Sequence, residues 1–397
     1  MSPRRTMRRI AILLFVILTI PLLVVASPDS TVEIKYERKI ANMDIGINGG
    51  AVSPLGETVL LFGADGYAHL ISAERAENYD LDVSLENETT EHLHAASWHP
   101  AGKSALIVGE SGVVLRYNST NYGLSEAEGS FAVSGKDIRA VQFTPGSSVA
   151  YLGTDDGQIW KYYADTFEMI NNEATSRITD ISCMKNENIC LVSTVSDGIA
   201  VIDQADTVTW LSNTRFDTWI GLSCADPFMT SCTAFASGKK TAEIDVDTQD
   251  SEKSSIGEIT IIGELEGDFV AVDEGHDSST IVGAGPMSLL RYTQYTQKSF
   301  LMFSNKDATD SDVYLGGDSY GFAWENSKNS GFLVTSYGRV VSFSPAEEET
   351  AGFVPGIVIF LIAISVPGVF IGMIYWNSPW LQKKYAQLFK RNKSSKK

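Results

Sequence analysis

Acidic residues are absent from both ends of this 397-residue chain, although it contains 49 of them. All 49 lie between residues 27 and 352. Subtracting the four basic residues at the start and the seven in the tail from the total of 31 leaves 20 in this middle part, whose net charge is therefore −29. Such a charge disfavours binding of nucleic acid or anionic lipid and favours basic partners or cations.

Charge is also missing from an apolar run near the start of the chain, Ile10 to Ala26, which follows four arginines. A basic start, an apolar middle and small residues such as Val24 and Ala26 before a polar stretch are typical of a secretory signal. The sequence predicts that residues 1–26 form a signal peptide cleaved after Ala26. A retained signal anchor is the alternative, because the run is long for a signal and short for a spanning helix.

A second run without charge, residues 353–376, is long enough to cross a membrane with some tilt. Trp376 and Trp380 follow it, and then seven basic residues. Aromatic residues at an interface and a basic flank are typical of the cytoplasmic side. The sequence therefore predicts a transmembrane helix over 353–376 and a cytoplasmic tail over 377–397. The part between the two apolar runs is expected outside the cytoplasm, on a single-pass membrane protein (two-pass if the signal is retained).

Cysteine is scarce, and its four copies form two similar pairs within the predicted exported part. The members of each pair flank one predicted hairpin turn, where the distance suits a disulfide. We predict the disulfides Cys183–Cys190 and Cys224–Cys232. A zinc site is disfavoured, because six and seven residues intervene, which exceeds the usual ligand spacing. With five histidines and no calcium loop that has the expected glycine, we predict neither a metal nor another cofactor.

One pattern occurs seven times: a strand of small residues, a polar turn, a more apolar strand, a glycine-containing turn and a third strand. The copies are Gly50–Ser72, Ala95–Asn118, Arg139–Tyr163, Thr179–Asp203, Ile220–Asp245, Phe269–Tyr292 and Tyr320–Phe343. Their second turns align at Gly66, Gly112, Gly157, Gly198, Lys240, Met287 and Gly338. Several short strands per unit of about 40–45 residues are the signature of a propeller blade. Gly238 and Gly285 lie just upstream of the two exceptions and are expected to replace the missing glycines.

Each blade of a propeller has a fourth, outer strand, and the gaps between the copies supply candidates for the first six. These are Tyr79–Leu85, Ser130–Val133, Phe167–Asn171, Thr207–Asn213, Glu258–Leu265 and Ser299–Ser304. The seventh copy has none after it, but a strand-like segment begins at Thr31, ahead of the first copy. An N-terminal strand that completes the last blade closes the ring and hides open sheet edges. The predicted fold is therefore an all-β, seven-bladed β-propeller over residues 31–345.

Two segments carry a resemblance to a known class. Ser97 to Gly102 with the following apolar strand, and Asp155 to Lys161, resemble the repeat core of WD40-like and YVTN-like propellers. The regular Gly-His and Trp-Asp dipeptides of WD40 repeats are missing. The resemblance implies an interaction scaffold rather than a particular chemistry.

Propellers bind ligands with residues near the central channel, and the starts of the innermost strands supply the candidates here. They are His94, Arg139, Asp180, Trp219, Asp268 and Tyr320. Aromatic residues and arginine are typical anchors for a peptide or protein partner. None of their spacings specifies an acid–base or nucleophilic arrangement, so we assign no catalytic residue. Asn87 and Asn118 match acceptor sites for N-linked glycans.

The leading hypothesis is a membrane-tethered receptor, scaffold or assembly factor that binds another extracytoplasmic or membrane protein. A propeller enzyme, such as a hydrolase or a quinoprotein-like oxidoreductase acting on a small molecule, is one alternative. A structural component of the cell surface is another. A deep acidic pocket would favour the enzyme, and a flat aromatic rim would favour the scaffold.

Overall fold

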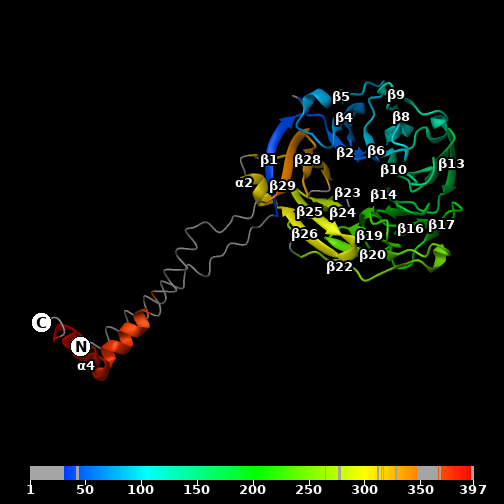
Figure 1. Cartoon of the computed structure of the whole chain (residues 1–397). Coiled ribbons are helices and arrows are strands. Elements are labelled where there is room, and N and C mark those ends of the chain that lie inside the picture. Colours follow the sequence, from blue (N-terminus) through cyan, green and yellow to red (C-terminus); the bar gives the residue numbers. More distant parts are fainter. Residues whose placement is uncertain are drawn as a thin grey trace. The chain divides into compact units, whose positions relative to one another are not determined.

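The computed structural model describes residues 31–41, 44–263, 265–275, 279–310, 313, 315, 317–326, 329–346, 365 and 368–394. The chain divides into two compact units, Pro28–Ala346 and a second unit made of Met1–Ser27 with Glu347–Lys397. The larger unit is a ring of seven antiparallel sheets (Figure 1), each of which is one blade. The predicted seven-bladed propeller is therefore confirmed.

Six blades follow one another along the chain, and each begins with its innermost strand. Blade one holds β2 (Ile47–Val52), β3 (Thr58–Gly63), β4 (Ala68–Ser72) and β5 (Val83–Ser84). Blade two holds β6 (Leu93–Trp98), β7 (Ser104–Gly109), β8 (Val114–Asn118) and β9 (Gly123–Glu126). Blade three holds β10 (Ile138–Phe143), β11 (Ala150–Thr154), β12 (Ile159–Tyr163) and β13 (Thr166–Asn171).

The later blades keep this order. Blade four holds β14 (Ile178–Cys183), β15 (Cys190–Thr194), β16 (Ile199–Ile202) and β17 (Val208–Trp210). Blade five holds β18 (Trp219–Ser223), β19 (Ser231–Ala236) and β20 (Lys240–Asp245), and two short strands, β21 (Ser255–Ile256) and β22 (Thr260–Ile261), both pair with β20. Blade six holds β23 (Phe269–Glu274), β24 (Ser279–Ala284), β25 (Ser288–Thr293) and β26 (Lys298–Phe303). Blade seven holds β27 (Tyr320–Glu325), β28 (Gly331–Thr335), β29 (Arg339–Pro345) and β1 (Val32–Lys39).

The apolar core lies between neighbouring blades. The second strand of each blade is buried along almost its whole length, as in β11 and β24, because another blade covers each of its faces. One cluster joins Leu106 and Val108 of blade two to Ile138 and Leu152 of blade three. Continuous apolar runs in these strands, rather than strict alternation, follow from burial on both faces.

Strand β1 closes the ring, as the sequence predicts. It pairs with β29 from Val32 opposite Pro345 to Lys39 opposite Arg339. Arg38 on this strand is buried, and its guanidinium donates to both carboxylate oxygens of Asp82 at 2.6 and 2.8 Å. Asp82 belongs to the loop between β4 and β5 of blade one. A buried ion pair therefore ties the closing strand to the neighbouring blade.

Most of the predicted glycine turns adopt a backbone conformation that favours glycine. Gly66, Gly112, Gly157, Gly198 and Gly338 all have positive φ angles, between 71° and 99°. In blade five, Gly238 at φ 79° replaces the missing glycine, as expected. In blade six the expectation for Gly285 is wrong, because this residue stays outside the left-handed region and precedes Pro286 through a cis peptide bond.

The outer strands depart from prediction in blades two and five. Residues Ser130–Val133 form a 3₁₀ helix, η5, because Gly129 before it takes a left-handed turn. The outer strand of blade two is instead β9, which follows β8 through a turn at Tyr122 with φ 53°. In blade five the predicted segment contains β22, but β21 lies ahead of it. The other four predicted segments contain β5 and β17 and most of β13 and β26.

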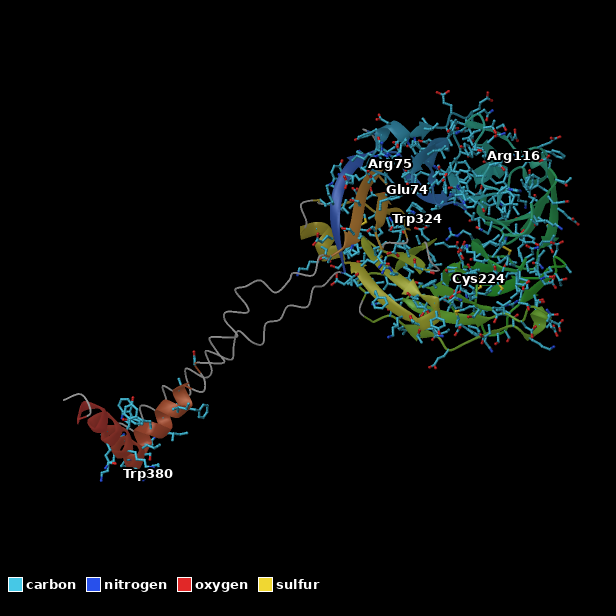
Figure 2. The ribbon with its side chains drawn as sticks, viewed as in Figure 1. Glu74, Arg75, Arg116, Cys224, Trp324 and Trp380 are labelled. Atoms are coloured by element: carbon cyan, nitrogen blue, oxygen red, sulfur yellow. A yellow bond between two sulfur atoms is a disulfide. The ribbon has the colours of Figure 1, made fainter. Side chains whose placement is uncertain are left out.

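Both predicted disulfides are present. Cys183 and Cys190 are direct partners across β14 and β15, with their Cα atoms 3.9 Å apart. Cys224 follows β18 and bonds to Cys232 on β19 (Figure 2). Each bond therefore links the first two strands of one blade.

In the second unit, residues 368–377 and α4 (Pro379–Ser394) are helical. Within the part of the chain that the structure describes, none of the helices combines the length and hydrophobicity that crossing a bilayer requires. The predicted signal, residues 1–26, and most of the predicted span, residues 353–376, lie outside the described residues. On α4, the ammonium group of Lys384 lies 4.5 Å from the ring centroid of Trp380.

Candidate binding face

The innermost strands form a closed ring around the central axis, because each contacts the innermost strand of the next blade. In every blade, the second residue of the innermost strand has no partner on the second strand of the same blade, because the pairing register skips it. The seven skipped residues are Asn48, His94, Arg139, Thr179, Ile220, Val270 and Gly321. Such β-bulges redirect side chains and are frequent next to functional sites. We call these seven residues the bulge ring.

His94 and Arg139, both predicted site residues, belong to the bulge ring and contact each other. Arg139 Nη1 donates to His94 Nε2 at 2.7 Å, and its Nε donates to Asp155 at 3.1 Å. Glu110 lies 3.4 Å from the same histidine nitrogen. Burial and the charge of Arg139 lower the pKa of His94, against the opposite effect of Glu110. A neutral His94 accepts the hydrogen bond from Arg139. This part of the ring therefore carries one positive group, Arg139, beside the carboxylates of Glu110 and Asp155.

Trp219 and Tyr320 occupy the first position of their strands, one residue before the bulge ring. Trp219 is fully buried, and its indole N–H donates to the Thr214 carbonyl at 2.7 Å. Its prediction as a channel-mouth residue is therefore wrong, because the first position points into the core between blades. The Tyr320 hydroxyl donates to Asp273 of blade six.

Asp180 lies one residue after the bulge ring and links two blades. Its carboxylate accepts a hydrogen bond at 2.8 Å from the backbone N–H of Leu222 on the next innermost strand. Asp273 repeats this arrangement by accepting from Ala323 at 3.0 Å. Ser97 accepts from the N–H of Phe143 at 2.9 Å in the same way. These side chains satisfy backbone groups at the free edge of the innermost strands.

Burial raises the pKa of Asp180 to about 7, although its two backbone hydrogen bonds act in the opposite direction. Burial also raises the pKa of Asp273 to about 7, and the charge of Asp180 adds to this shift, while Tyr320 and Ala323 oppose it. Strongly shifted carboxyl groups are frequent at functional sites, but structural networks produce them too.

Asp268 lies two residues before the bulge ring and stabilises the turn of blade five. It accepts hydrogen bonds from the Ser237 hydroxyl at 2.6 Å and from the N–H groups of Gly238 and Lys239 at 2.8 and 3.1 Å. Burial acts to raise the pKa of Asp268, but these bonds hold it below its usual value. Its role is that of a turn cap rather than a ligand-facing group.

The structure thus brings together only His94 and Arg139 of the six predicted residues. The sequence-based choice missed Asn48, Thr179, Ile220 and Val270, of which Val270 is 51% exposed. Aligning the repeats on the first buried residue of each innermost strand would have identified them. Alignment on the second turn does not identify them, because the bulge shifts the register between the second turn and the innermost strand.

The two glycan acceptor residues differ in their surroundings. The side-chain amide of Asn87 donates to the Gly66 carbonyl at 2.8 Å. Asn118 ends β8 and is exposed. Among the residues that the structure describes, no three His, Cys, Asp or Glu side chains converge as metal ligands.

Comparisons with known proteins identify the fold. No family model matches the chain, and no curated protein matches it. A structure of YCF48 bound to D1 peptide superposes with a TM-score of 0.56 at 14% identity, covering 79% of this chain and 97% of that one. The WD40 β-propeller domain of Doa1 superposes with a TM-score of 0.59 at 12% identity, covering 79% and 98%. The predicted WD40-like propeller fold is therefore confirmed.

Proposed function

We propose that this chain is a protein-binding platform whose partner contacts the face of the propeller that carries the bulge ring. The observation that carries this proposal is the bulge ring itself. It places six side chains and the backbone of Gly321 at equivalent positions around the axis, and it includes the partly exposed His94–Arg139 pair and the exposed Val270. Arginine beside apolar groups is a typical composition for the centre of an interface.

A solved propeller of the same fold supports this assignment, because YCF48 in that structure is bound to a peptide. The two chains share 14% identity, so the partner itself does not carry over. The charge of −29 between residues 27 and 352 favours a partner with a basic surface.

The membrane anchor is part of the same proposal. The uncharged run over 353–376 and the basic tail over 377–397 support a span with a cytoplasmic C-terminus. The oxidised cysteine pairs fit an oxidising compartment outside the cytoplasm. The short linker after Ala346 would keep the propeller near the membrane, where it would bind a membrane protein or another extracytoplasmic protein.

Crosslinking in intact membranes followed by pull-down tests the binding role. Wild-type protein should recover a reproducible partner, and Arg139→Ala should recover at least about tenfold less, the loss expected from truncating an anchor residue. Arg116→Ala is the matched control, because Arg116 forms an exposed ion pair with Asp165 on the outer part of blades two and three (Figure 2). Absence of any reproducible partner would overturn the proposal.

Protease treatment of intact cells tests the anchor. The propeller should be cleaved from outside while an epitope tag after Lys397 stays protected. A protected propeller would contradict the proposed orientation, whatever the outcome of the crosslinking.

One observation favours the enzyme as second candidate. Asp180 and Asp273 have pKa values near 7, where a carboxyl group acts well as acid or base. Turnover of a small substrate by the purified protein, abolished in Asp273→Asn, would support the enzyme. Both carboxylates are already used to bond backbone N–H groups, so the binding platform has the stronger support.

A further inference from the structure

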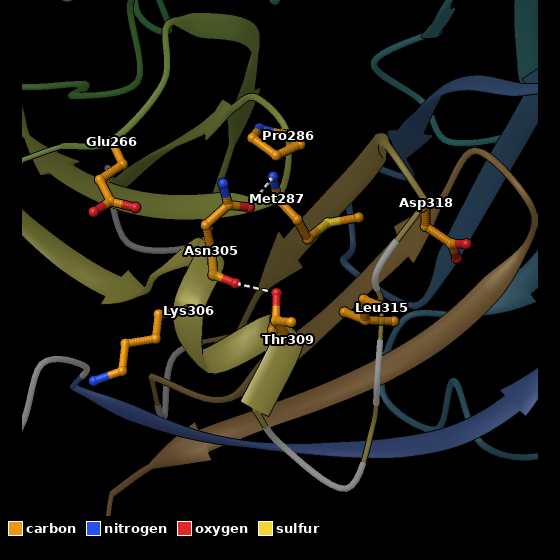
Figure 3. Close-up of a pocket in the computed structure, with 10 residues that line it drawn as sticks. Glu266, Pro286, Met287, Asn305, Lys306, Thr309, Leu315 and Asp318 are labelled. Carbon is orange, nitrogen blue, oxygen red and sulfur yellow. Dashed lines mark hydrogen bonds between the residues drawn. The ribbon is translucent and has the colours of Figure 1, made fainter.

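A cavity of about 460 Å³ lies between blades six and seven (Figure 3), on the side where the innermost strands begin. Its walls come from the turn at Pro286 and Met287, from the short helix α2 (Asn305–Asp310) and from Leu315, Gly317 and Asp318. The volume falls within the usual range for ligand sites, about 300–1,000 Å³. The chain thus holds a recess of ligand size on the same side as the bulge ring.

The floor of the cavity is apolar and buried. Met287, Ala308 and Leu315 line it, and each is at most 3% exposed. The Leu315 N–H donates to the Ala308 carbonyl at 3.0 Å, which holds Leu315 against the helix. An apolar floor of this kind favours a side chain that loses water on binding.

Polar and charged groups stand at the rim, and they include the exposed Lys306 as well as Glu266. Asn305 accepts from the Met287 N–H at 3.0 Å through Oδ1, and the structure records no partner for its Nδ2 among the described residues. Figure 3 shows this amide nitrogen directed toward Pro286 and Glu266. Glu266 is exposed and, within the described ranges, forms no ion pair. Asp318 also lines the cavity but is already bonded to Thr335 at 2.9 Å.

We propose that this cavity receives a peptide segment of the partner protein in which an apolar residue is followed by lysine or arginine. The apolar side chain packs on Met287 and Leu315, a peptide carbonyl accepts from Asn305 Nδ2, and the basic side chain pairs with Glu266. The proposal rests on the proposed binding function and names the chemistry of its partner. The overall acidity of the propeller favours the same basic segment.

Selection from a random heptapeptide display library, with the full chain in detergent as the target, tests this assignment. Wild-type protein should enrich peptides with adjacent apolar and basic residues. Glu266→Lys should abolish the preference for the basic residue while the apolar preference remains. Thr309→Trp, at an exposed position on the cavity wall, should weaken binding of the selected peptides at least tenfold, because the indole fills the mouth.

Glu173→Lys is the control, because Glu173 is exposed in the loop before blade four and takes no part in the cavity. It should leave affinities within twofold of wild type. If the enriched peptides bind both cavity variants as tightly as wild type but bind Arg139→Ala more weakly, the cavity proposal is wrong and the proposed binding platform stands. A crosslink from the cavity to another part of this same chain would also overturn it. Failure to enrich any peptide, together with no partner in the pull-down, would overturn both proposals.

Discussion

Asp180 and Asp273 look like candidate acid–base residues but stabilise the fold. Each carboxylate lies on an innermost strand and accepts a backbone N–H from the next blade. A serine performs the same task for Phe143. The acceptor oxygen is therefore the shared requirement, and the charge is an additional property that only the carboxylates bring.

That charge makes stability depend on pH. The folded pKa values near 7 lie above the ordinary value of 3.8, so the folded state binds more protons than the unfolded state between these limits. The contribution of each group to the free energy of unfolding should fall as pH rises from about 4 to 7, by at most about 1.4 kcal/mol per pH unit. Asp273→Asn should reduce this slope, as measured by urea unfolding at several pH values between 5 and 8.

Asp250→Asn is the control for that measurement. Asp250 pairs with Lys253, and this hydrogen bond lowers the pKa of Asp250, so it titrates below the tested window. Equal slopes for wild type and Asp273→Asn would contradict the assignment.

Arg38 provides a second prediction for a single residue. Arg38→Ala removes the bidentate partner of Asp82 and should lower the free energy of unfolding by about 3–5 kcal/mol, because a mostly buried carboxylate loses its counter-charge. Lys35→Ala, on the same strand, removes an ammonium group whose side chain is 76% exposed and leaves Glu37 its hydrogen bond from Ser342, so it should cost no more than about 1 kcal/mol. Chemical denaturation of both variants distinguishes them, and similar losses would refute the special role of Arg38.

At the scale of the elements, hairpins were predicted best. A turn of few residues brings its two strands together whatever the rest of the chain does, so the glycine turns and the facing cysteines follow from local sequence. The outer strands were harder, because they are short, half-exposed and held by one neighbour only. Ser130–Val133 became a helical turn, although its apolar residues suit a strand.

The disulfides stabilise their hairpins to a limited extent. Replacing Cys183 and Cys190 together by alanine should lower the free energy of unfolding by about 2–3 kcal/mol, the chain-entropy value for so short a loop. The same change at Cys224 and Cys232 should act similarly, and reduction of wild-type protein should reproduce both losses. Unchanged stability after complete reduction, verified by mass spectrometry, would contradict this expectation.

The whole molecule depends on closure of the ring by β1. Deleting residues 28–39 exposes the edge of β29 and leaves Asp82 without Arg38. An open sheet edge promotes association between chains, so this variant should lose its monomer peak in size-exclusion chromatography. Deletion of residues 347–397 keeps β1 and β29 paired and should leave the propeller monomeric. A monomeric β1 deletion would show that closure is dispensable.

The number of blades, the strand that closes the ring and the two disulfides could all be predicted from the sequence alone. Each of these follows from repeated local patterns and short hairpins, whose partners are close in the chain. The side chains that meet at the axis could not be predicted in this way, because a single skipped residue in each innermost strand moves the following side chains to the opposite face. Trp219, one residue before the bulge, lies in the core, whereas Val270, at the bulge itself, is exposed. The cavity at Met287 and Leu315 also needed the structure, since it joins two blades and a helical turn that no repeat pattern predicts.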